Sequence, residues 1–331
     1  MDIKETLKSY YHLKNVKLEI LDGGYRNQCY KVICERGEYV FIIYKREADT
    51  LKTIRAAHMV ANELYKKGFP SRVPIQTNTS RNIIRIKRQD GFHNGALYPF
   101  LSGTTIPWEA YTRRHLKSMG KVISDMHYTL KPFKNLKCKI KNWSDFTESE
   151  IKRMQVYLKG VETWIEKKLH VSLNWKFIKK VFKEIITQTK SYPHNILHYD
   201  FVRGNILFSH RLDKHIDIYP ITGIIDFEKV CFGPEIADIA RTLAFLIVDC
   251  KYKSERMVRK RFLFSGYEKR GKNALTFSDS EQEVLEQLLN FFWLRDFWKF
   301  LVHNPYEDLY LNEHYVRTRK RLVQNQILIP L

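Results

Sequence analysis

The sequence predicts an α+β fold, in which a small β-rich part over residues 1–97 precedes a larger helical part over residues 98–331. Three observations support this expectation. Short apolar segments separated by glycine-bearing turns fill residues 21–45 and predict strands. The segments Thr147 to Glu150 and Ser278 to Glu281 match the capping box that begins many helices. With 331 residues, of which 44% are hydrophobic, the chain can bury a substantial core.

The N-terminal part is expected to contain strands joined by a glycine-bearing loop. Gly23 and Gly24 permit a close approach of the backbone to another molecule, and the alternation after Asn27 continues as a strand. Residues 39–45 then form an apolar strand that ends in Lys45. A glycine pair is most often a plain turn, and a lysine that closes a strand is most often exposed. Their position, well before a loop motif in the C-terminal part, favours a functional interpretation.

A helix is expected over residues 50–67, because Gly68 and Pro70 follow it directly. Glu63 is its only acidic residue, and hence the only residue of this helix that could pair with Lys45. The alternative is that this glutamate is a solvated surface residue.

Further helices are expected in the C-terminal part. They are predicted from Thr147 to about Gly160 and over residues 164–169, 175–189 and 278–301. The last of them carries aromatic residues at helical spacing, which favours a core position over a ligand site: Phe291, Phe292, Trp293 and Trp298.

The most informative motif lies between His198 and Phe208. It places Asp200 five residues before Asn205 on a loop between two short strands, and Asp226 is the last polar residue of a later apolar strand. Phosphoryl transfer to an alcohol needs one carboxylate to accept the hydroxyl proton. It also needs an amide and a second carboxylate to hold Mg²⁺ on the phosphates of ATP. Each piece alone is often a turn former, but the combination predicts an ATP-dependent kinase.

These residues receive distinct roles in this interpretation. Asp200 is the base for the acceptor hydroxyl, Asn205 and Asp226 hold Mg²⁺, and Lys45 binds the phosphates of ATP. Arg203 is assigned to the catalytic residues, where it would touch the γ-phosphate, a phosphorylated product or an acidic substrate. The alternative role of Arg203 is that of a surface cation over the loop.

In their order along the chain, these segments resemble the aminoglycoside phosphotransferase/choline kinase-like superfamily. The resemblance covers about residues 18–245 and rests on eight short segments, none of which is specific alone: Leu21 to Val32, Lys45, Gly68 to Pro74, Leu97 to Gly103, Gly120 to His127, His198 to Phe208, Ile225 to Glu228, and Gly233 to Arg241. It implies a bilobal protein kinase-like fold with a small β-rich lobe, a large helical lobe and a hinge at residues 97–103.

The resemblance also implies how ATP would bind. The loop that contains Gly23, Gly24 and Asn27 would cover the phosphates, and backbone groups of Tyr98 and Phe100 would meet the adenine. Departures from the family pattern concern the acceptor side and the metal loop. Arg203 stands where small-molecule kinases commonly have proline, and the residue after Asp226-Phe is a glutamate rather than the glycine of protein kinases.

Two further residues are expected to support the catalytic loop. Asp238 would brace this loop from the start of a helix, and His198 would orient it by hydrogen bonding. Both are interpreted as structural residues that take no part in proton transfer.

Within the superfamily, the chain most resembles the spore-coat kinases of endospore-forming bacteria, the CotS/YutH-like group. The residues that carry this resemblance are Tyr199, Arg203, the charged segment after Asp238 and the aromatic-rich helix near the C-terminus. The resemblance implies a role in sporulation, location in the cytoplasm or on the spore coat, and an acidic or coat protein as a candidate acceptor.

The charge of the chain narrows the choice of partners. Its 57 Lys and Arg against 36 Asp and Glu give a formal net charge of +21 at pH 7, and this positive field favours anionic partners over small cations. Basic residues cluster at positions 251–261 and 317–321, either as a partner surface or as solvated helix faces. No nucleic-acid-binding module is recognisable, so nucleic acid ranks last.

The remaining composition predicts a cytosolic protein. The N-terminus lacks the apolar segment of a signal peptide, and no apolar stretch reaches the length of a membrane span. The five cysteines are odd in number and scattered, which favours reduced thiols.

Two alternatives to a coat-protein kinase stay open. One is a small-molecule kinase for a sugar, an amino alcohol or an antibiotic. The other is a catalytically weak pseudokinase that serves as a structural scaffold of the spore coat. The sequence does not specify the acceptor.

Overall fold

The computed structural model describes residues 2–21, 27–133, 140–210, 218–267 and 278–331. The chain divides into two compact units. The sheet unit contains Met1–Thr105 together with two later segments, Asn205–Arg211 and Ile221–Lys229. The helical unit contains Ile106–Gly204, Leu212–Pro220 and Val230–Leu331. A sheet in the N-terminal region and a mostly helical C-terminal region confirm the predicted α+β class.

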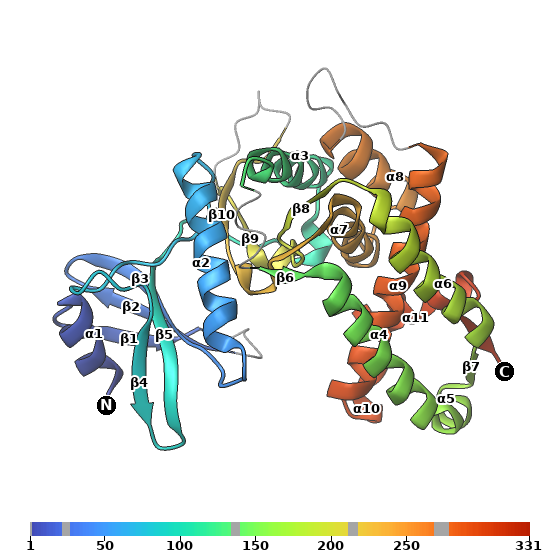
Figure 1. Ribbon diagram of the computed structural model, residues 1–331, viewed down its shortest axis with the longest axis horizontal. Helices are drawn as coiled ribbons and strands as arrows, with labels where there is room; N and C mark the ends of the chain where they lie inside the picture. Colours follow the sequence, from blue (N-terminus) through green and yellow to red (C-terminus); the bar gives the residue numbers. More distant parts are fainter. Residues whose placement is uncertain (1, 22–26, 134–139, 211–217, 268–277) are drawn as a thin grey trace. The chain divides into compact units, whose positions relative to one another are not determined.

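The sheet unit is built on one antiparallel sheet with the strand order β1-β2-β3-β5-β4 (Figure 1). The strands of this sheet and the two α-helices of the described part of the unit are, in chain order, α1 (Ile3–Tyr11), β1 (Lys17–Ile20), β2 (Gln28–Cys34), β3 (Gly37–Ile43), α2 (Thr50–Lys66), β4 (Ile84–Arg88) and β5 (Gly91–Pro99). The predicted strand over 39–45 and the predicted helix over 50–67 are thus confirmed.

Alternate residues of β3 face opposite sides of the sheet, as the pleat of a strand requires. Phe41 and Ile43 pack in a core cluster with Leu7 and Tyr11 of α1. Val40, Ile42 and Tyr44 pack in a second cluster with Ile54 of α2, on the other face of the sheet. Ala96 and Tyr98 belong to the same cluster. Each fully buried large side chain stabilises the fold by about 1.5–3 kcal/mol. These contacts therefore attach α1 to one face of the sheet and α2 to the other.

A short antiparallel pair of strands completes the sheet unit. It consists of β9 (Ile206–Phe208) and β10 (Ile221–Ile224). Phe208 bridges to Thr104, and the Ile224 N–H donates to Pro70 O at 2.8 Å. These bonds attach the two later segments of the chain to the N-terminal part of the same unit.

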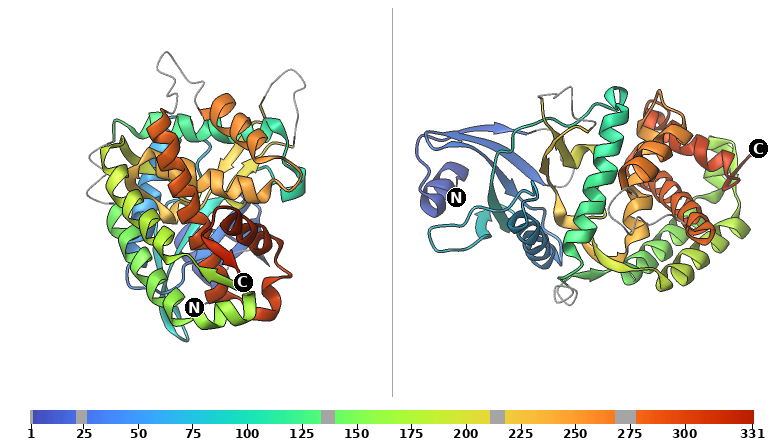
Figure 2. Two further views of the ribbon diagram at one scale, coloured as in Figure 1. Left: turned by 90° about the vertical axis from the view of Figure 1, so that its right-hand side faces the viewer. Right: turned by 90° about the horizontal axis from the view of Figure 1, so that it is seen from above.

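The helical unit contains most of the helices and three short β-pairings (Figures 1 and 2). Its helices are η1 (Trp108–Ala110), α3 (Arg113–Leu130), α4 (Trp143–Gly160), α5 (Glu162–Leu169), α6 (Trp175–Gln188), η3 (Thr189–Ser191), α7 (Glu235–Asp249), α8 (Glu255–Arg259), η6 (Lys260–Tyr267), α9 (Asp279–His303), α10 (Tyr306–Leu309) and α11 (Glu313–Gln324). Its strands are β6 (Lys141–Asn142), β7 (Val171–Leu173), β8 (His194–Leu197), β11 (Cys231–Pro234) and β12 (Leu328–Pro330), in the orders β6-β11-β8 and β12-β7.

Helix α9 is the centre of this unit. It packs against α6, α7 and α11, and its aromatic residues are buried as predicted: Phe291, Phe292, Trp293 and Trp298. Polar residues of α9 are buried too, which requires internal partners. Arg295 Nε pairs with Glu150 Oε2 at 2.6 Å, and Asp296 pairs with Arg241 at 3.0 Å.

One of the two predicted capping boxes is correct. Ser278 accepts from the Glu281 N–H at 3.3 Å, and Glu281 accepts from the Ser278 N–H at 2.8 Å, so α9 begins as expected. The prediction of a helix start at Thr147 is wrong, because α4 begins at Trp143 behind an Asn142 cap. Glu150 does not reach back to a helix end, because its carboxylate binds Arg295 inside the unit.

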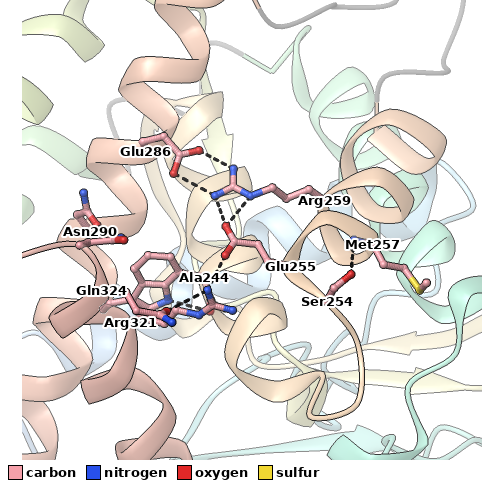
Figure 3. A network of polar contacts seen from close by, with 11 residues as sticks. Ala244, Ser254, Glu255, Met257, Arg259, Glu286, Asn290, Arg321 and Gln324 are labelled. Carbon is pink, nitrogen blue, oxygen red and sulfur yellow. Dashed lines mark hydrogen bonds and ion pairs between the residues drawn. The ribbon is translucent and has the colours of Figure 1, made fainter.

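Several residues of the predicted basic clusters bind within the protein. Arg259 of α8 pairs with Glu255 at 2.5 Å and with Glu286 of α9 at 2.6 Å. Arg321 of α11 binds the other oxygen of Glu255 at 2.6 Å, so alternating charges join three helices (Figure 3). Such networks contribute more than isolated surface pairs. Among the described residues, no helix combines the length and the apolar character that crossing a membrane requires.

Helix α3 approaches η6 closely at a glycine. η6 is a π-helix, a rare conformation. A Cβ atom at Gly120 would collide with the Phe262 carbonyl oxygen and lie 2.9 Å from the Tyr267 nitrogen. Both are backbone atoms, so the contact can form only with glycine at position 120.

We therefore expect Gly120→Ala to lower the free energy of unfolding by about 3 kcal/mol, because α3 and η6 must separate to admit the methyl group. Urea unfolding measures this change. Gly160→Ala is the matched control, since a Cβ at Gly160 meets no atom within 4 Å. Equal stability of the two variants would contradict the close approach.

Candidate active site

The predicted catalytic loop lies in the helical unit, directly after β8. Asp200 is buried, with 7% of its surface exposed, and its carbonyl accepts from the Val202 N–H at 2.8 Å. The Asp200 N–H donates to His198 Nδ1 at 3.3 Å, so His198 orients the loop as expected. The tight turn presents Asp200 at one fixed place between β8 and the short 3₁₀ segment Arg203–Asn205.

A fully buried carboxylate, that of Asp238, holds this loop. Its two oxygens accept from the backbone N–H groups of His198 at 3.0 Å and Tyr199 at 2.8 Å. Tyr199 has a left-handed backbone (φ 60°), which is unfavourable for a tyrosine unless neighbouring bonds impose it. Asp238 lies in the first turn of α7, where the helix dipole favours a negative charge. The predicted bracing role of Asp238 is confirmed.

The other face of Asp238 is bonded through two side chains to η6. His127 Nε2 lies 3.1 Å from Asp238 Oδ2, and His127 Nδ1 lies 3.1 Å from Tyr267 Oη. Burial raises the pKa of Tyr267 well above its usual value, so its hydroxyl stays protonated and can donate to His127. The catalytic loop is thus bonded to α7, α3 and η6.

The two predicted metal ligands lie in the sheet unit. Asn205 precedes β9, Asp226 follows β10, and the Ile225 N–H donates to Asn205 O at 3.0 Å. Asp226 also has a left-handed backbone (φ 60°), a conformation that aspartate tolerates better than most residues, and its Oδ1 lies 3.4 Å from the Glu228 N–H.

This donor set fits Mg²⁺ on a nucleotide. Among the described residues, no group of three or more His, Cys, Asp or Glu side chains is arranged to hold a metal by itself. One carboxylate and one amide oxygen would leave the other positions to phosphate oxygens and water, which is how Mg²⁺ usually binds at nucleotide sites.

The predicted phosphate-binding residues are only partly described. Gly23 and Gly24 lie outside the described residues. Asn27 accepts from the Lys45 N–H at 3.1 Å and donates to Glu228 Oε1 at 2.5 Å. Asn27 thus joins the end of β3 to the segment that follows Asp226. Sequence reasoning missed this link, although the glutamate at position 228 was a visible departure from the glycine of protein kinases.

Glu63 does not pair with Lys45. It binds the exposed Lys66 of the same helix at 2.8 Å, and its own side chain is half-buried. The Lys45 side chain is 60% exposed, and its ammonium nitrogen lies 3.9 Å from Glu47 Oε1. In the described residues, α2 therefore supplies no carboxylate to Lys45.

A buried polar chain joins α2 to the end of β3 instead. His58 Nε2 of α2 lies 2.6 Å from Tyr98 Oη, and Tyr98 Oη bonds to Tyr44 Oη, next to Lys45. Burial lowers the pKa of His58 to about 4 and raises the pKa values of both tyrosines. All three groups are thus neutral near pH 7.

The predicted adenine contacts lie at the end of β5. Tyr98 pairs with Val40 in the sheet, and the Phe100 N–H donates to Glu38 O at 3.2 Å. This N–H is already satisfied within the sheet. The contact of Tyr98 and Phe100 with adenine stays a prediction.

Arg203 is anchored inside the helical unit. Its Nε lies 3.4 Å from Asp249 Oδ2, and its guanidinium lies 5.5 Å from the centre of the Trp108 ring. Sequence reasoning did not predict these two partners. Asp249 follows Arg203 by about 46 positions along the chain, and Trp108 precedes it by about 95 positions.

Comparison with known proteins agrees with this geometry. Residues 17–266 match the model of the phosphotransferase enzyme family. Because this match covers most of the chain, the protein belongs to that family. A comparison with curated proteins gives no match.

The chain also has the protein kinase-like fold, as its likeness to solved structures shows. An amicoumacin kinase solved with AMP-PNP, Ca²⁺ and Ami is similar over 98% of this chain and 92% of its own, with 14% identity and a TM-score of 0.71. A microcompartment-associated aminopropanol kinase matches over 97% of both chains, with 11% identity and a TM-score of 0.66. The ethanolamine kinase of Plasmodium vivax matches over 98% of this chain and 86% of its own, with 15% identity and a TM-score of 0.62.

Asp238→Asn is expected to lower the free energy of unfolding by about 2–3 kcal/mol, because an amide nitrogen cannot accept a backbone N–H and leaves a buried donor unsatisfied. Thermal and urea unfolding measure the loss. The control Asp308→Asn changes an exposed carboxylate and should stay within about 0.5 kcal/mol of the parent protein. A parent-like Asp238→Asn variant would contradict the bracing role.

His58 predicts a pH dependence of stability. Its pKa in the folded protein is about 4, below the usual 6.5, so the unfolded chain binds a proton more readily. This contribution is fully present above about pH 6.5 and is lost as the pH falls toward 4. The glutamine of His58→Gln does not titrate. Between about pH 6.5 and 4, the free energy of unfolding of this variant should therefore fall by up to about 3 kcal/mol less than that of the parent protein. Urea unfolding at a series of pH values, with the exposed His303→Gln as control, tests this; equal pH profiles of His58→Gln and the parent would refute it.

Proposed function

We propose that the protein is an ATP- and Mg²⁺-dependent phosphotransferase that moves the γ-phosphoryl group of ATP to a hydroxyl group. The observation that carries this proposal is the fixed catalytic loop. The Asp238 carboxylate holds the backbone on both sides of the turn that leads into Asp200. Five residues later, Asn205 bonds through its carbonyl to Ile225, directly before Asp226.

The chemistry follows from these groups. Asp200 accepts the proton of the acceptor hydroxyl, whose oxygen forms a new bond to the γ-phosphorus. The bond between that phosphorus and the bridging oxygen of ADP breaks, and ADP leaves with the electron pair. Asn205 and Asp226 are the residues that would hold Mg²⁺, which when bound neutralises charge on the phosphates.

The nucleotide phosphates are assigned to the end of β3. Lys45 contributes an exposed ammonium, and Asn27 fixes the backbone of Lys45 against Glu228. The Asn27 bonds restrain this end of the strand together with the Thr50 hydroxyl, which donates to Lys45 O at 3.0 Å.

A small molecule is the acceptor class that the comparisons support best. The similar structures are described as kinases of amicoumacin, aminopropanol and ethanolamine. Phosphorylation of a coat protein and location on the spore coat rest on the sequence resemblance alone and stay predictions.

A second candidate is a scaffold with weak catalysis. The specific observation in its favour is the pairing of Glu63 with Lys66 rather than with Lys45. A kinase-like protein whose phosphate-binding lysine is not oriented by the helix would bind nucleotide without efficient transfer.

The first experiment is a thermal shift with ATP, with and without Mg²⁺, together with a release assay for ADP. We expect Mg²⁺-dependent stabilisation of about 2–4 kcal/mol at saturating ATP. In Asp226→Ala this stabilisation and all transfer should be lost, while the fold without nucleotide stays intact.

Asp90→Ala is the control, because Asp90 is an exposed carboxylate of the same unit at the turn between β4 and β5. Nucleotide binding without turnover in the parent protein would favour the scaffold. Turnover in Asp226→Ala would refute the assignment of Asp226 to the metal.

A further inference from the structure

Helix α7 ends in a buried carboxylate that takes no part in the proposed phosphoryl transfer. Asp249 is 2% exposed and is the last residue of this helix. The C-terminal end of a helix carries negative partial charge, so a buried carboxylate is unfavourable there unless cations offset it. A buried carboxylate at this position therefore needs cationic or hydrogen-bonding partners.

Two cationic or titratable side chains meet Asp249. Arg203 Nε lies 3.4 Å from Oδ2, and His314 Nδ1 of α11 lies 3.0 Å from Oδ1. Arg203 is the only one of these groups on the catalytic loop, three residues after Asp200. Its side chain stays 39% exposed, so the guanidinium is anchored on one side and open on the other.

One aromatic ring, that of Trp108, lies beside this guanidinium. The Trp108 ring lies 5.5 Å from the Arg203 carbon that bears the charge. Tyr111 is buried, and its hydroxyl has no hydrogen-bond partner among the described residues. Burial raises the pKa of Tyr111, so this hydroxyl stays protonated inside the unit.

The acidic groups nearby are largely neutralised. Asp249 is satisfied by Arg203 and His314, and Glu313 pairs with Lys251 at 2.9 Å. Glu109 is exposed in η1, next to Trp108. Beside the proposed catalytic loop lie a partly exposed guanidinium and an indole ring, with the Glu109 carboxylate next to the indole along the chain.

We infer that Trp108 and Arg203 form part of the acceptor subsite of this protein, and that the subsite selects an acceptor that carries a carboxylate or another anionic oxygen group besides its hydroxyl. The guanidinium binds the anionic group, and Trp108 packs against the carbon skeleton. Asp249 is a positioning residue that fixes the guanidinium. This inference rests on the proposed phosphotransferase function.

The test compares small polyhydroxy compounds of similar size and different charge. Glucosamine is cationic, glucose is neutral and glucuronate is anionic; 2-aminopropane-1,3-diol, glycerol and glycerate form a smaller series. Their binding to the full chain is measured by calorimetry in the presence of Mg²⁺ and AMP-PNP. We expect the anionic member of at least one series to bind on the order of tenfold more tightly than the cationic one.

Three variants separate the subsite from the general positive field. Arg203→Gln should abolish the charge preference, and Arg203→Lys should restore part of it. Arg256→Gln removes the same charge from an exposed site on α8 and should leave the preference unchanged. A preference that survives in Arg203→Gln, or that falls equally in Arg256→Gln, overturns the inference, and so does the absence of any charge preference in both series.

Asp249→Asn distinguishes positioning from plain electrostatics. Removing a negative charge should strengthen anion binding if only the local field matters. If Asp249 positions Arg203, affinity for the anionic member should instead fall severalfold, and a rise would refute that role. AMP-PNP binding is measured in the same samples. If the parent protein does not bind AMP-PNP, the proposed function itself is contradicted. If it binds AMP-PNP but shows no charge preference among the acceptors, only the subsite is refuted.

Discussion

The buried carboxylate of Asp238 is the constraint on which the catalytic loop depends. A desolvated charge is costly unless it is fully bonded, and this one accepts from two backbone N–H groups and lies against the His127 imidazole. Those bonds maintain the left-handed backbone of Tyr199, which turns the chain from β8 toward Asp200. The turn therefore exists because one helix start supplies the acceptor that it needs.

The same helix also restrains the residues directly after Asp200. Asp238 and Asp249 lie eleven positions apart on α7, or about 16 Å along its axis. The first holds the start of the loop and the second holds Arg203. A single rigid element thus fixes two points of a short segment. This arrangement lets the loop keep a strained conformation without relying on its own side chains, and it ties the orientation of Arg203 to that of Asp200.

Local patterns in the sequence predicted those features that depend on residues close together along the chain. The strand that ends near Lys45, the helix after it, the capping box at Ser278 and the core position of the aromatic helix were all readable from spacing. The predicted capping box at Thr147 was wrong, because Glu150 forms an ion pair with Arg295, about 145 positions away along the chain. The partners of Arg203, the bond of Asn27 to Glu228 and the chain from His58 to Tyr44 also join distant residues. No periodicity encodes such pairs, because their members lie far apart along the chain.

The path of the chain between the two units has a further consequence. The sheet unit is not one continuous stretch, since Asn205–Arg211 and Ile221–Lys229 belong to it although the helical unit begins at Ile106. A gene fragment that ends near residue 105 would lack β9, β10 and Asp226. Neither unit can therefore be inherited, exchanged or inserted as a self-contained cassette. The residues inferred to contact the acceptor, by contrast, all lie in the helical unit.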